Sequence, residues 1–341
     1  MPNKQHTTPV KPNRQEHPFA SFVRVLGRGR KGSRSLTEAE ACQAMTMILD
    51  GEVEDVQLGA FLMLLRVKEE TAEELTGFVK AARASIDTGI DTPRVDIDWS
   101  SYAGKKRQLN WYLLSALLLA SNGFRVFMHG ASGHTAGRIY SEDVLRNLGL
   151  PIADSWDEAK RQLQSFCFSY MPLRILCPTL YQIIELRNIL GLRSPVHSFA
   201  RLLNPLDSPA VIQGIFHPGF RPLHREVALR MQYQRMAVIK GDSGEIERDP
   251  GINCLVQWAA NGESGNDKWP ALNTRRSHDD LEMNIDSLRQ TWCGDTRHEY
   301  GENAVTGTAA IALWLMGKVK TIAEAEQSSM QMWVNRNRDL L

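Results

Sequence analysis

Two consecutive strand, loop and helix units between residues 95 and 148 constrain the fold of this chain more than any other feature. The first unit has a strand that begins at Val95, a polar loop, and an apolar helix at residues 111–120. The second has a strand at residues 124–128, a glycine-rich loop, and a helix around Val144. Strands that are joined by a helix pair in parallel through a right-handed crossover. Both loops are therefore expected at the same end of one sheet.

That end of the sheet is the predicted ligand position. Free backbone N–H groups and the helix dipole meet in a loop between a strand's carboxyl end and a helix's amino end, and together they attract phosphate. The first loop also carries three consecutive cations, Lys105, Lys106 and Arg107. The sequence thus predicts an anion-binding site there.

The remaining pattern predicts a tail and two domains. Residues 1–18 hold four prolines among polar residues, which favours a disordered tail. Apolar residues at helical spacing predict a small all-helical domain over residues 19–90, and its apolar run at residues 61–65 is expected to pack on two sides, one of them another subunit. Residues 91–341 predict an α/β domain with a mainly parallel central sheet. Its further strands are expected at residues 166–170, 211–216, 235–240 and 252–256, and loops are expected to dominate residues 241–293.

Composition limits the choice of partner and compartment. The net charge of +1 gives no global attraction for a polyanion, so such a partner must be argued from local clusters. The five cysteines form no CxxC pair, which suits a reducing compartment. No secretory leader and no apolar stretch near the roughly 20 residues of a membrane span is found, so we expect a cytoplasmic protein with no membrane partner.

A second basic segment lies at residues 27–35, where four cations and three glycines occur without an acid. It predicts a flexible positive loop, and a solvated surface turn is the alternative. With the first loop and two further arginines it gives the candidate nucleic-acid contacts, which are Arg28, Arg30, Lys31, Arg34, Tyr102, Lys105, Lys106, Arg107, Arg138 and Arg201.

Four segments, at residues 65–68, 143–149, 187–194 and 202–205, carry a family resemblance. In order and spacing they are similar to the LRMK, SADVLEALG, R-x-x-LG-x-R-T and LGPL-x-NP segments of anthranilate phosphoribosyltransferase and its relatives, glycosyltransferase family 3. The resemblance implies a dimer formed through the helical domain, to which a helix at about residues 178–192 is joined in space. It also implies transfer from phosphoribosyl diphosphate to an aromatic amine with Mg²⁺.

The chain departs from that family in each segment with which the family binds phosphate or Mg²⁺. The GTGGD loop is replaced by Ser-Ser-Tyr-Ala-Gly at residues 100–104, and the KHGNR motif by Met-His-Gly-Ala-Ser at residues 128–132. In the segment at residues 244–247, Ile246 replaces the Asp of the Mg²⁺ pair, so a solvated turn is expected there rather than a weak metal site made by Glu245 and Glu247. Cys177 stands in place of a His, whereas Arg187 matches the acceptor-binding Arg. What the resemblance leaves is a ligand-binding remnant of Ser101, Gly104, Asn110, His129, Gly130 and Arg187, with no catalytic residue and no metal or other cofactor expected.

The pattern Ser-Tyr-x-Gly-x-x-Arg-Gln-x-Asn at residues 101–110 resembles the non-catalytic YbiB group of this family. That resemblance implies a homodimer that binds nucleic acid, chiefly single-stranded DNA, without strong sequence preference. Tyr102, Trp99 and Trp111 lie beside the cations, and an exposed one could stack a base. For Trp111 we expect the core instead, and for His129 and His134 the surface of a loop.

Three hypotheses follow. In the first, the basic loops face a groove and bind a single strand through its phosphates. In the second, the chain is an active phosphoribosyltransferase of altered substrate, with Mg²⁺ and phosphoribosyl diphosphate held by Lys105, Lys106, Arg107, Arg187 and Glu247. The third is a protein-interaction scaffold with neither activity.

Overall fold

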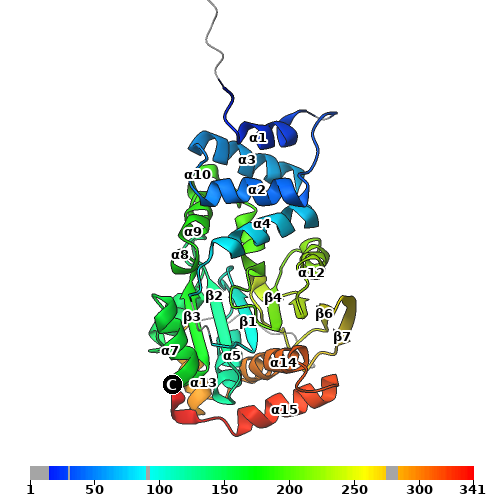
Figure 1. Ribbon diagram of the computed structural model, residues 1–341. Helices are drawn as coiled ribbons and strands as arrows, with labels where there is room; N and C mark the ends of the chain where they lie inside the picture. The colour runs from blue at the N-terminus through cyan, green and yellow to red at the C-terminus, as the bar shows by residue number, and fades with distance from the viewer. Residues whose placement is uncertain (1–14, 30, 90–92, 274–282) are drawn as a thin grey trace, which may run out of the picture.

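The computed structural model describes residues 15–29, 31–89, 93–273 and 283–341 (Figure 1). Most of the predicted tail, residues 1–14, and the predicted contact Arg30 lie outside these ranges. A helical bundle sits at one end of the molecule, and a layer of helices and strands forms the rest. The predicted combination of a helical domain with a larger α/β domain is confirmed.

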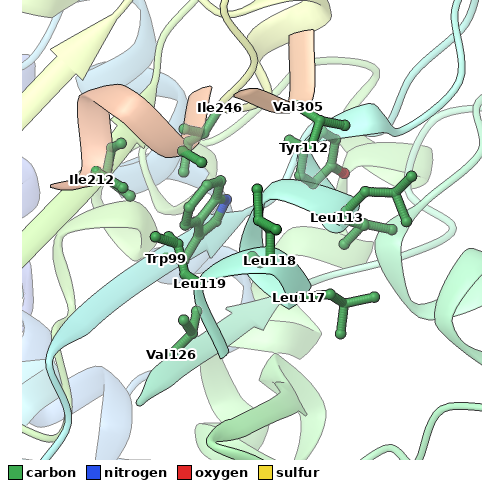
Figure 2. Packing of buried hydrophobic residues seen from close by; sticks show 14 of the residues in the cluster. Trp99, Tyr112, Leu113, Leu117, Leu118, Leu119, Val126, Ile212, Ile246 and Val305 are labelled. Carbon is green, nitrogen blue, oxygen red and sulfur yellow. The ribbon is translucent and has the colours of Figure 1, made fainter. Parts of the chain in front are cut away.

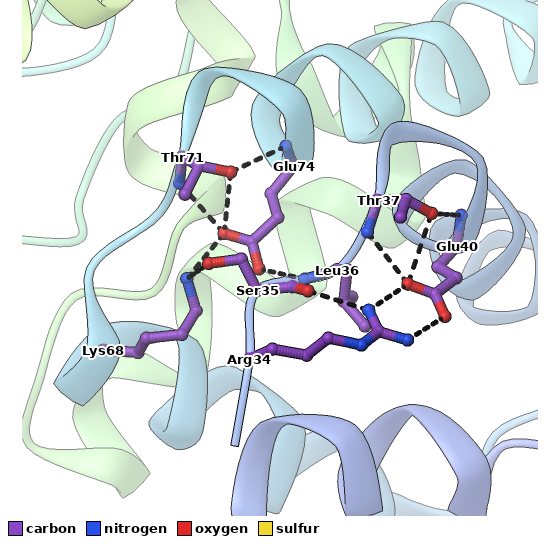
Figure 3. A network of polar contacts seen from close by, with 8 residues as sticks. All are labelled: Arg34, Ser35, Leu36, Thr37, Glu40, Lys68, Thr71 and Glu74. Atoms are coloured by element: carbon purple, nitrogen blue, oxygen red, sulfur yellow. Dashed lines mark hydrogen bonds and ion pairs between the residues drawn. The ribbon is translucent and has the colours of Figure 1, made fainter. Parts of the chain in front are cut away.

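The bundle contains four helices from the start of the chain: α1 (Ala20–Gly27), α2 (Glu38–Leu49), α3 (Asp55–Lys68) and α4 (Ala72–Ser85). Capping boxes begin α2 and α4, where Thr37 pairs with Glu40 and Thr71 pairs with Glu74. The two boxes lie side by side (Figure 3). Three short helices, α8 (Leu173–Leu176), α9 (Pro178–Glu185) and α10 (Arg187–Leu190), extend from the sheet toward the bundle. The side chains of α9 pack in one hydrophobic cluster with those of α3, because both present an apolar stripe to the same core.

The described strands form one sheet with the order β3-β2-β1-β4-β5-β6-β7. Its parallel strands are β1 (Ile97–Ser101), β2 (Val126–Gly130), β3 (Phe168–Pro172), β4 (Ala210–Gly214) and β5 (Arg235–Ile239). Antiparallel β6 (Cys254–Ala260) and β7 (Glu263–Trp269) complete the edge. The mainly parallel sheet is confirmed, whereas β7 lies in the stretch that was predicted to be loop.

Helices cover both faces of the sheet. They are α5 (Trp111–Ser121), α6 (Ser141–Asn147), α7 (Trp156–Phe166), α11 (Val196–Phe199), α12 (Phe220–Arg230), α13 (Asp286–Cys293), α14 (Glu299–Leu315) and α15 (Ile322–Val334), with short 3₁₀ turns at Ala200–Leu202, Asp242–Gly244 and Arg338–Leu340. None of these helices, nor any other described one, is long and apolar enough to cross a bilayer.

The core beneath the predicted ligand loop is formed by α5, which is buried on nearly all faces. Figure 2 shows Trp99 of β1 packed between the side chains of α5 and Ile246. Trp99 and Trp111 are fully buried, so Trp111 is in the core as expected and stacking of a base on Trp99 is excluded. A closely packed layer therefore supports the loop that follows β1.

Candidate functional site

The loops that follow β1, β4 and β5 meet the helical bundle in a cleft of about 120 Å³. The bundle contributes Arg66 and Glu70, and the sheet contributes the ends of its strands. Three arginines and one acid line this cleft, and burial raises the pKa of that acid, Glu70. The lining residues are Arg66, Glu70, Ala103, Arg193, Ser194, Pro195, His197, Ser198, Arg201, Gly214, Ile215, Phe216, His217, Phe220, Ser243 and Gly244.

The predicted phosphate loop is closed by the chain's own carboxylate. Glu245 is fully buried, and its Oε1 accepts hydrogen bonds from the backbone N–H groups of Ala103 at 2.6 Å and Gly104 at 2.7 Å. Gly104 has φ +66°, a left-handed conformation that helps successive N–H groups converge on one anion. A carboxylate oxygen thus occupies the position where this type of loop holds a phosphate oxygen. Burial raises the pKa of Glu245, while Arg201 and the two N–H groups counteract the rise.

The second carboxylate of this turn, Glu247, forms a buried ion pair with Lys105. Lys105 Nζ lies 2.7 Å from Glu247 Oε1, with both side chains at most 1% exposed. Glu247 Oε2 accepts the backbone N–H of Tyr112 at 3.1 Å, in the first turn of α5, where the helix dipole favours an anion. The prediction of a solvated turn at residues 244–247 is therefore wrong, and the side chain of Lys105 does not face a groove as the first hypothesis expected. Each of these charges is buried because the other compensates it.

These residues do not fit Mg²⁺ and phosphoribosyl diphosphate. Mg²⁺ needs free oxygen ligands in near-octahedral geometry. Glu247 is held by a lysine, Glu245 is held by main-chain N–H groups, and Ile246 points into the hydrophobic core (Figure 2). Within the described ranges no group of three or more His, Cys, Asp or Glu side chains is arranged to hold a metal ion.

Tyr102 and His129 belong to a buried chain of hydrogen bonds. The Tyr102 hydroxyl lies 2.7 Å from His129 Nδ1, and His129 Nε2 lies 3.2 Å from Asp98 Oδ1. Burial raises the pKa of Tyr102 well above its usual value, and Arg201 lies over its ring at 5.6 Å. Tyr102 is 2% exposed, so this candidate contact cannot stack a base. The predicted surface positions of His129 and His134 are wrong, since both are buried.

The other residues of the predicted remnant are part of the same packed layer. Ser101 Oγ lies 2.6 Å from Ser141 Oγ, and Asn110 Nδ2 donates to the Tyr112 hydroxyl at 2.9 Å. At Gly130 a Cβ would lie 1.9 Å from the Ser101 carbonyl oxygen, so only glycine allows β1 and β2 to approach there. Together these groups fill the pocket that they were predicted to border.

Four arginines lie close together beside the closed loop and form no ion pair with a described acid: Arg138, Arg187, Arg193 and Arg201. Arg138 donates to the carbonyl oxygens of Ala103 at 3.0 Å and Gly104 at 2.9 Å, so it fixes the loop from outside. Arg187 donates to the His134 carbonyl at 2.6 Å and to the Thr135 hydroxyl. Arg201 is buried and donates to the His197 carbonyl.

Arg193 was not singled out from the sequence. Burial, together with Arg201, Arg187 and Arg138, lowers its pKa to about 10. A guanidinium held among other cations is stabilised by an external anion. The signal for it was present, because it is the last arginine of the segment at residues 187–194 that carries the family resemblance.

The predicted surface cations have separate positions. Lys106 and Arg107 are exposed beside the site, and so are Arg28 and Lys31 in the loop between α1 and α2. Arg34 binds both carboxylate oxygens of Glu40 and holds the pKa of that carboxyl at about 2 (Figure 3). Figure 1 shows the loop between α1 and α2 running along the end of the bundle to the start of α2. At the end of this loop the Ser35 hydroxyl accepts a hydrogen bond from Lys68 Nζ at 3.1 Å, two residues after Arg66 of the cleft.

Two family profiles match the chain. The helical bundle domain of a glycosyl transferase family matches residues 23–86, and the a/b domain of such a family matches residues 97–334. The second match alone covers more than half of the chain.

Relatives in sequence include enzymes and a protein without an assigned activity. The anthranilate phosphoribosyltransferase of Nitratidesulfovibrio vulgaris is 31% identical over 233 residues, which are 67% of this chain and 67% of that enzyme. The enzyme of the same name from Geobacillus thermodenitrificans is 27% identical over 315 residues, 88% of this chain and 90% of the enzyme. The uncharacterized protein YbiB of Escherichia coli is 28% identical over 209 residues, 59% of this chain and 64% of YbiB.

Solved structures share the fold. Anthranilate phosphoribosyltransferase from Thermus thermophilus superposes with a TM-score of 0.74 at 19% identity, covering 93% of this chain and 94% of that one. The enzyme from Saccharomyces cerevisiae in complex with PRPP and Mg superposes with the same TM-score of 0.74 at 14% identity, covering 94% of each chain. At these identities the likeness concerns the fold alone.

Proposed function

Because this chain belongs to glycosyl transferase family 3, whose helical bundle and a/b domains it carries in order, we propose that it is a member that binds nucleic acid in place of phosphoribosyl diphosphate. The ligand in this proposal is a single strand, chiefly DNA, bound without strong sequence preference. The protein acts as a homodimer, and it performs no transfer.

The observation that carries the proposal is the carboxylate of Glu245 on the N–H groups of Ala103 and Gly104. A small phosphate ligand would have to displace a buried, doubly hydrogen-bonded anion to reach these donors. Losing even one preorganised donor of this kind costs an enzyme about 10²–10³ in rate. The buried pair of Lys105 with Glu247 removes a further cation and a metal ligand.

The rim of the closed pocket supports a longer anion. Arg193 and Arg66 line the cleft, and Lys106 and Arg107 are exposed on the loop after β1. Cations that are not committed to acids of the protein can neutralise successive phosphates and release the counterions condensed on the strand. Binding should therefore weaken steeply with salt.

The dimer in this proposal uses the helical bundle. Val67 at the end of α3 is 83% exposed and Ile189 of α10 is 81% exposed, and Val56 and Leu192 are exposed in the same helices or next to them. Large apolar side chains this open are typical of an interaction surface. Two clefts in one dimer would give a strand two contact sites.

The second candidate is phosphoribosyl transfer with an altered substrate. It is favoured by the 31% identity to an anthranilate phosphoribosyltransferase and by the match of Arg187. The hydrogen bond that holds Glu245 and the ion pair that holds Glu247 oppose it, because neither carboxylate is left to bind Mg²⁺. Incubation with phosphoribosyl diphosphate, anthranilate and Mg²⁺ decides between the two candidates, and we expect no product.

Fluorescence anisotropy with a labelled single-stranded oligonucleotide tests the proposal. Arg193→Gln should weaken binding and leave the melting temperature equal or higher, because the substitution also relieves repulsion among the cations. Arg161→Gln is the matched control, since Arg161 is exposed and pairs with Glu158 on α7. Absence of salt-sensitive binding by the unaltered protein, or equal affinity in the two variants, would refute the proposal.

A further inference from the structure

We propose that Phe216 is the stacking platform for one unpaired base of the bound strand. This inference rests on the nucleic-acid binding proposed above and adds a base-binding part to the cationic cleft. It replaces Tyr102, Trp99 and Trp111, whose rings are all buried.

Phe216 is an exposed aromatic ring at the carboxyl end of the sheet. It follows β4 by two residues, lines the cleft, and is 51% exposed. Its neighbour His217 meets it edge-on at 5.4 Å between ring centroids. Behind it lies Gly244, whose φ is +95° and where an added Cβ would lie 3.8 Å from Phe216 Cβ. The backbone is thus close on one side, and the ring remains half open to the cleft.

An exposed phenyl ring keeps apolar surface in water that a stacked base would cover. The large exposed hydrophobic side chains include one other aromatic ring in the described part of the chain, that of Phe166 at the end of α7. Phe166 does not line the cleft, whereas Phe216 lies among its arginines. An aromatic face combined with cations is the arrangement on which proteins stack the bases of single strands.

His197 is a neutral part of the wall of the same cleft. It is 7% exposed, and its Nδ1 lies 3.3 Å from both the carbonyl oxygen and the hydroxyl of Ser194. Burial, with His134, Arg193 and Arg201, lowers the pKa of His197 to about 2, so the ring stays neutral. The polar groups that an incoming nucleotide meets in this cleft are therefore chiefly the arginines.

The charge of the cleft favours a base that is attached to a phosphate. Arg193 and Arg66 at the same cleft can take the adjoining phosphate. Bases in a duplex are stacked and paired, so only an unpaired base can enter. The occupant we commit to is therefore a nucleotide of a single strand.

The test compares a thymidine oligonucleotide with an abasic strand of the same number of phosphates. Phe216→Ala should weaken binding of the thymidine strand by about 5- to 150-fold, which corresponds to the roughly 1–3 kcal/mol of one stacked base. It should leave binding of the abasic strand unchanged. Phe216→Tyr should retain binding of the thymidine strand, and Phe166→Ala should behave as the unaltered protein with both strands.

The outcomes distinguish a failure of the stacking inference from a failure of the proposed function. If Phe216→Ala binds the thymidine strand as the unaltered protein does, while Arg193→Gln loses affinity, the stacking inference is refuted and the proposed function stands. If Phe216→Ala weakens both strands equally, the ring acts on the shape of the cleft and the inference is again refuted. If the unaltered protein binds neither strand in a salt-dependent way, the proposed function itself fails.

Discussion

At the scale of single residues, the two carboxylates at positions 245 and 247 occupy the groups of the loop after β1 that could otherwise bind an anion. Glu245 satisfies main-chain N–H groups of the loop, and Glu247 neutralises Lys105. Each contact joins residues that are more than 140 positions apart in the chain. The donors of this loop already have carboxylates of the protein as partners, so they need no phosphate ligand.

Replacement of Glu245 by Ala should reopen this site. Two buried N–H groups would lose their acceptor, and each unsatisfied group costs about 1–3 kcal/mol, so the variant should melt at a lower temperature. Inorganic phosphate should restore part of that loss, because it can take the position of the carboxylate, whereas it should not affect the unaltered protein. Thermal unfolding in phosphate and in chloride of equal ionic strength measures the difference.

Glu245→Gln is the control for this experiment, since its amide oxygen can still accept from the two N–H groups. It should be more stable than Glu245→Ala and gain less from phosphate. Equal gains from phosphate in both variants and in the unaltered protein would show that phosphate acts elsewhere.

Buried neutral histidines should make the fold sensitive to acid. His224 donates from Nδ1 to Gln213 Oε1 at 2.7 Å, and burial followed by Arg201 lowers its pKa to about 3. The unfolded chain takes up this proton near pH 6.5. Between those two pH values the unfolded state binds more protons, so stability is lost as pH falls, by about 1.4 kcal/mol per pH unit for each such group. Burial also lowers the pKa of His134 to about 4, which adds to the effect.

His224→Asn isolates one of these contributions, because its amide can keep the bond to Gln213. The variant should be less stable at pH 7 but should lose about 2 kcal/mol less than the unaltered protein between pH 6.5 and pH 5. Urea unfolding at the two pH values gives both numbers. Equal losses in the two proteins would mean that His224 is already protonated in the fold.

At the scale of elements, the capping boxes of α2 and α4 have the same pattern, a Thr followed three residues later by a Glu, but different environments (Figure 3). Glu40 is partly exposed and pairs with Arg34, whereas Glu74 is fully buried. Glu74 also accepts from the backbone N–H of Leu36 at 2.8 Å and from Lys68 Nζ at 2.7 Å. One side chain thus joins the starts of α2 and α4 to the end of α3.

Substitution of Glu40 and of Glu74 by Gln should show how much more the buried capping box contributes to stability than the exposed one. Glu74→Gln should cost about 3 kcal/mol, because Lys68 and several N–H donors would lose a buried carboxylate. Glu40→Gln should cost about 1 kcal/mol or less, as expected for an exposed pair. Urea unfolding of both variants measures the difference, and equal costs would contradict the burial of Glu74.

The sequence predicted most of the elements because their apolar periodicity is strong, as in α3 and α5. It missed α7, where Ala159 and Leu163 are the only hydrophobic side chains that are buried, and it missed α13. It also missed β7, whose residues alternate little because an edge strand has one neighbour and exposed side chains. The burial of Lys105 and Tyr102 was unpredictable for a different reason. Their environments depend on Glu247 and on β2, which lie far away in the sequence.

At the scale of the whole molecule, the bundle and the sheet have distinct parts in the proposed function. The sheet edge supplies the cleft, and the bundle supplies one wall of it and the exposed apolar side chains of α3 and α10. If two copies pair through these side chains, one strand can contact both clefts, and affinity rises through the high effective concentration of the second site.

Ile189→Glu should therefore shift the protein to monomers, because it places a charge in the apolar surface. A strand long enough to reach both clefts should lose more affinity than a short strand that occupies one cleft. Light scattering and anisotropy with the two lengths measure these effects. Unchanged dimers in the variant would place the interface elsewhere.

The most direct test of the central claim is the anisotropy of a labelled single strand across about 50 to 200 mM salt, with phosphoribosyl diphosphate and Mg²⁺ as competitors. The closed phosphate loop and the cationic rim predict a steep dependence, with a slope of about −3 to −4 for roughly four to six neutralised phosphates. They also predict no displacement of the strand by the competitors. A binding constant that does not change with salt, or displacement by micromolar phosphoribosyl diphosphate, would contradict the account.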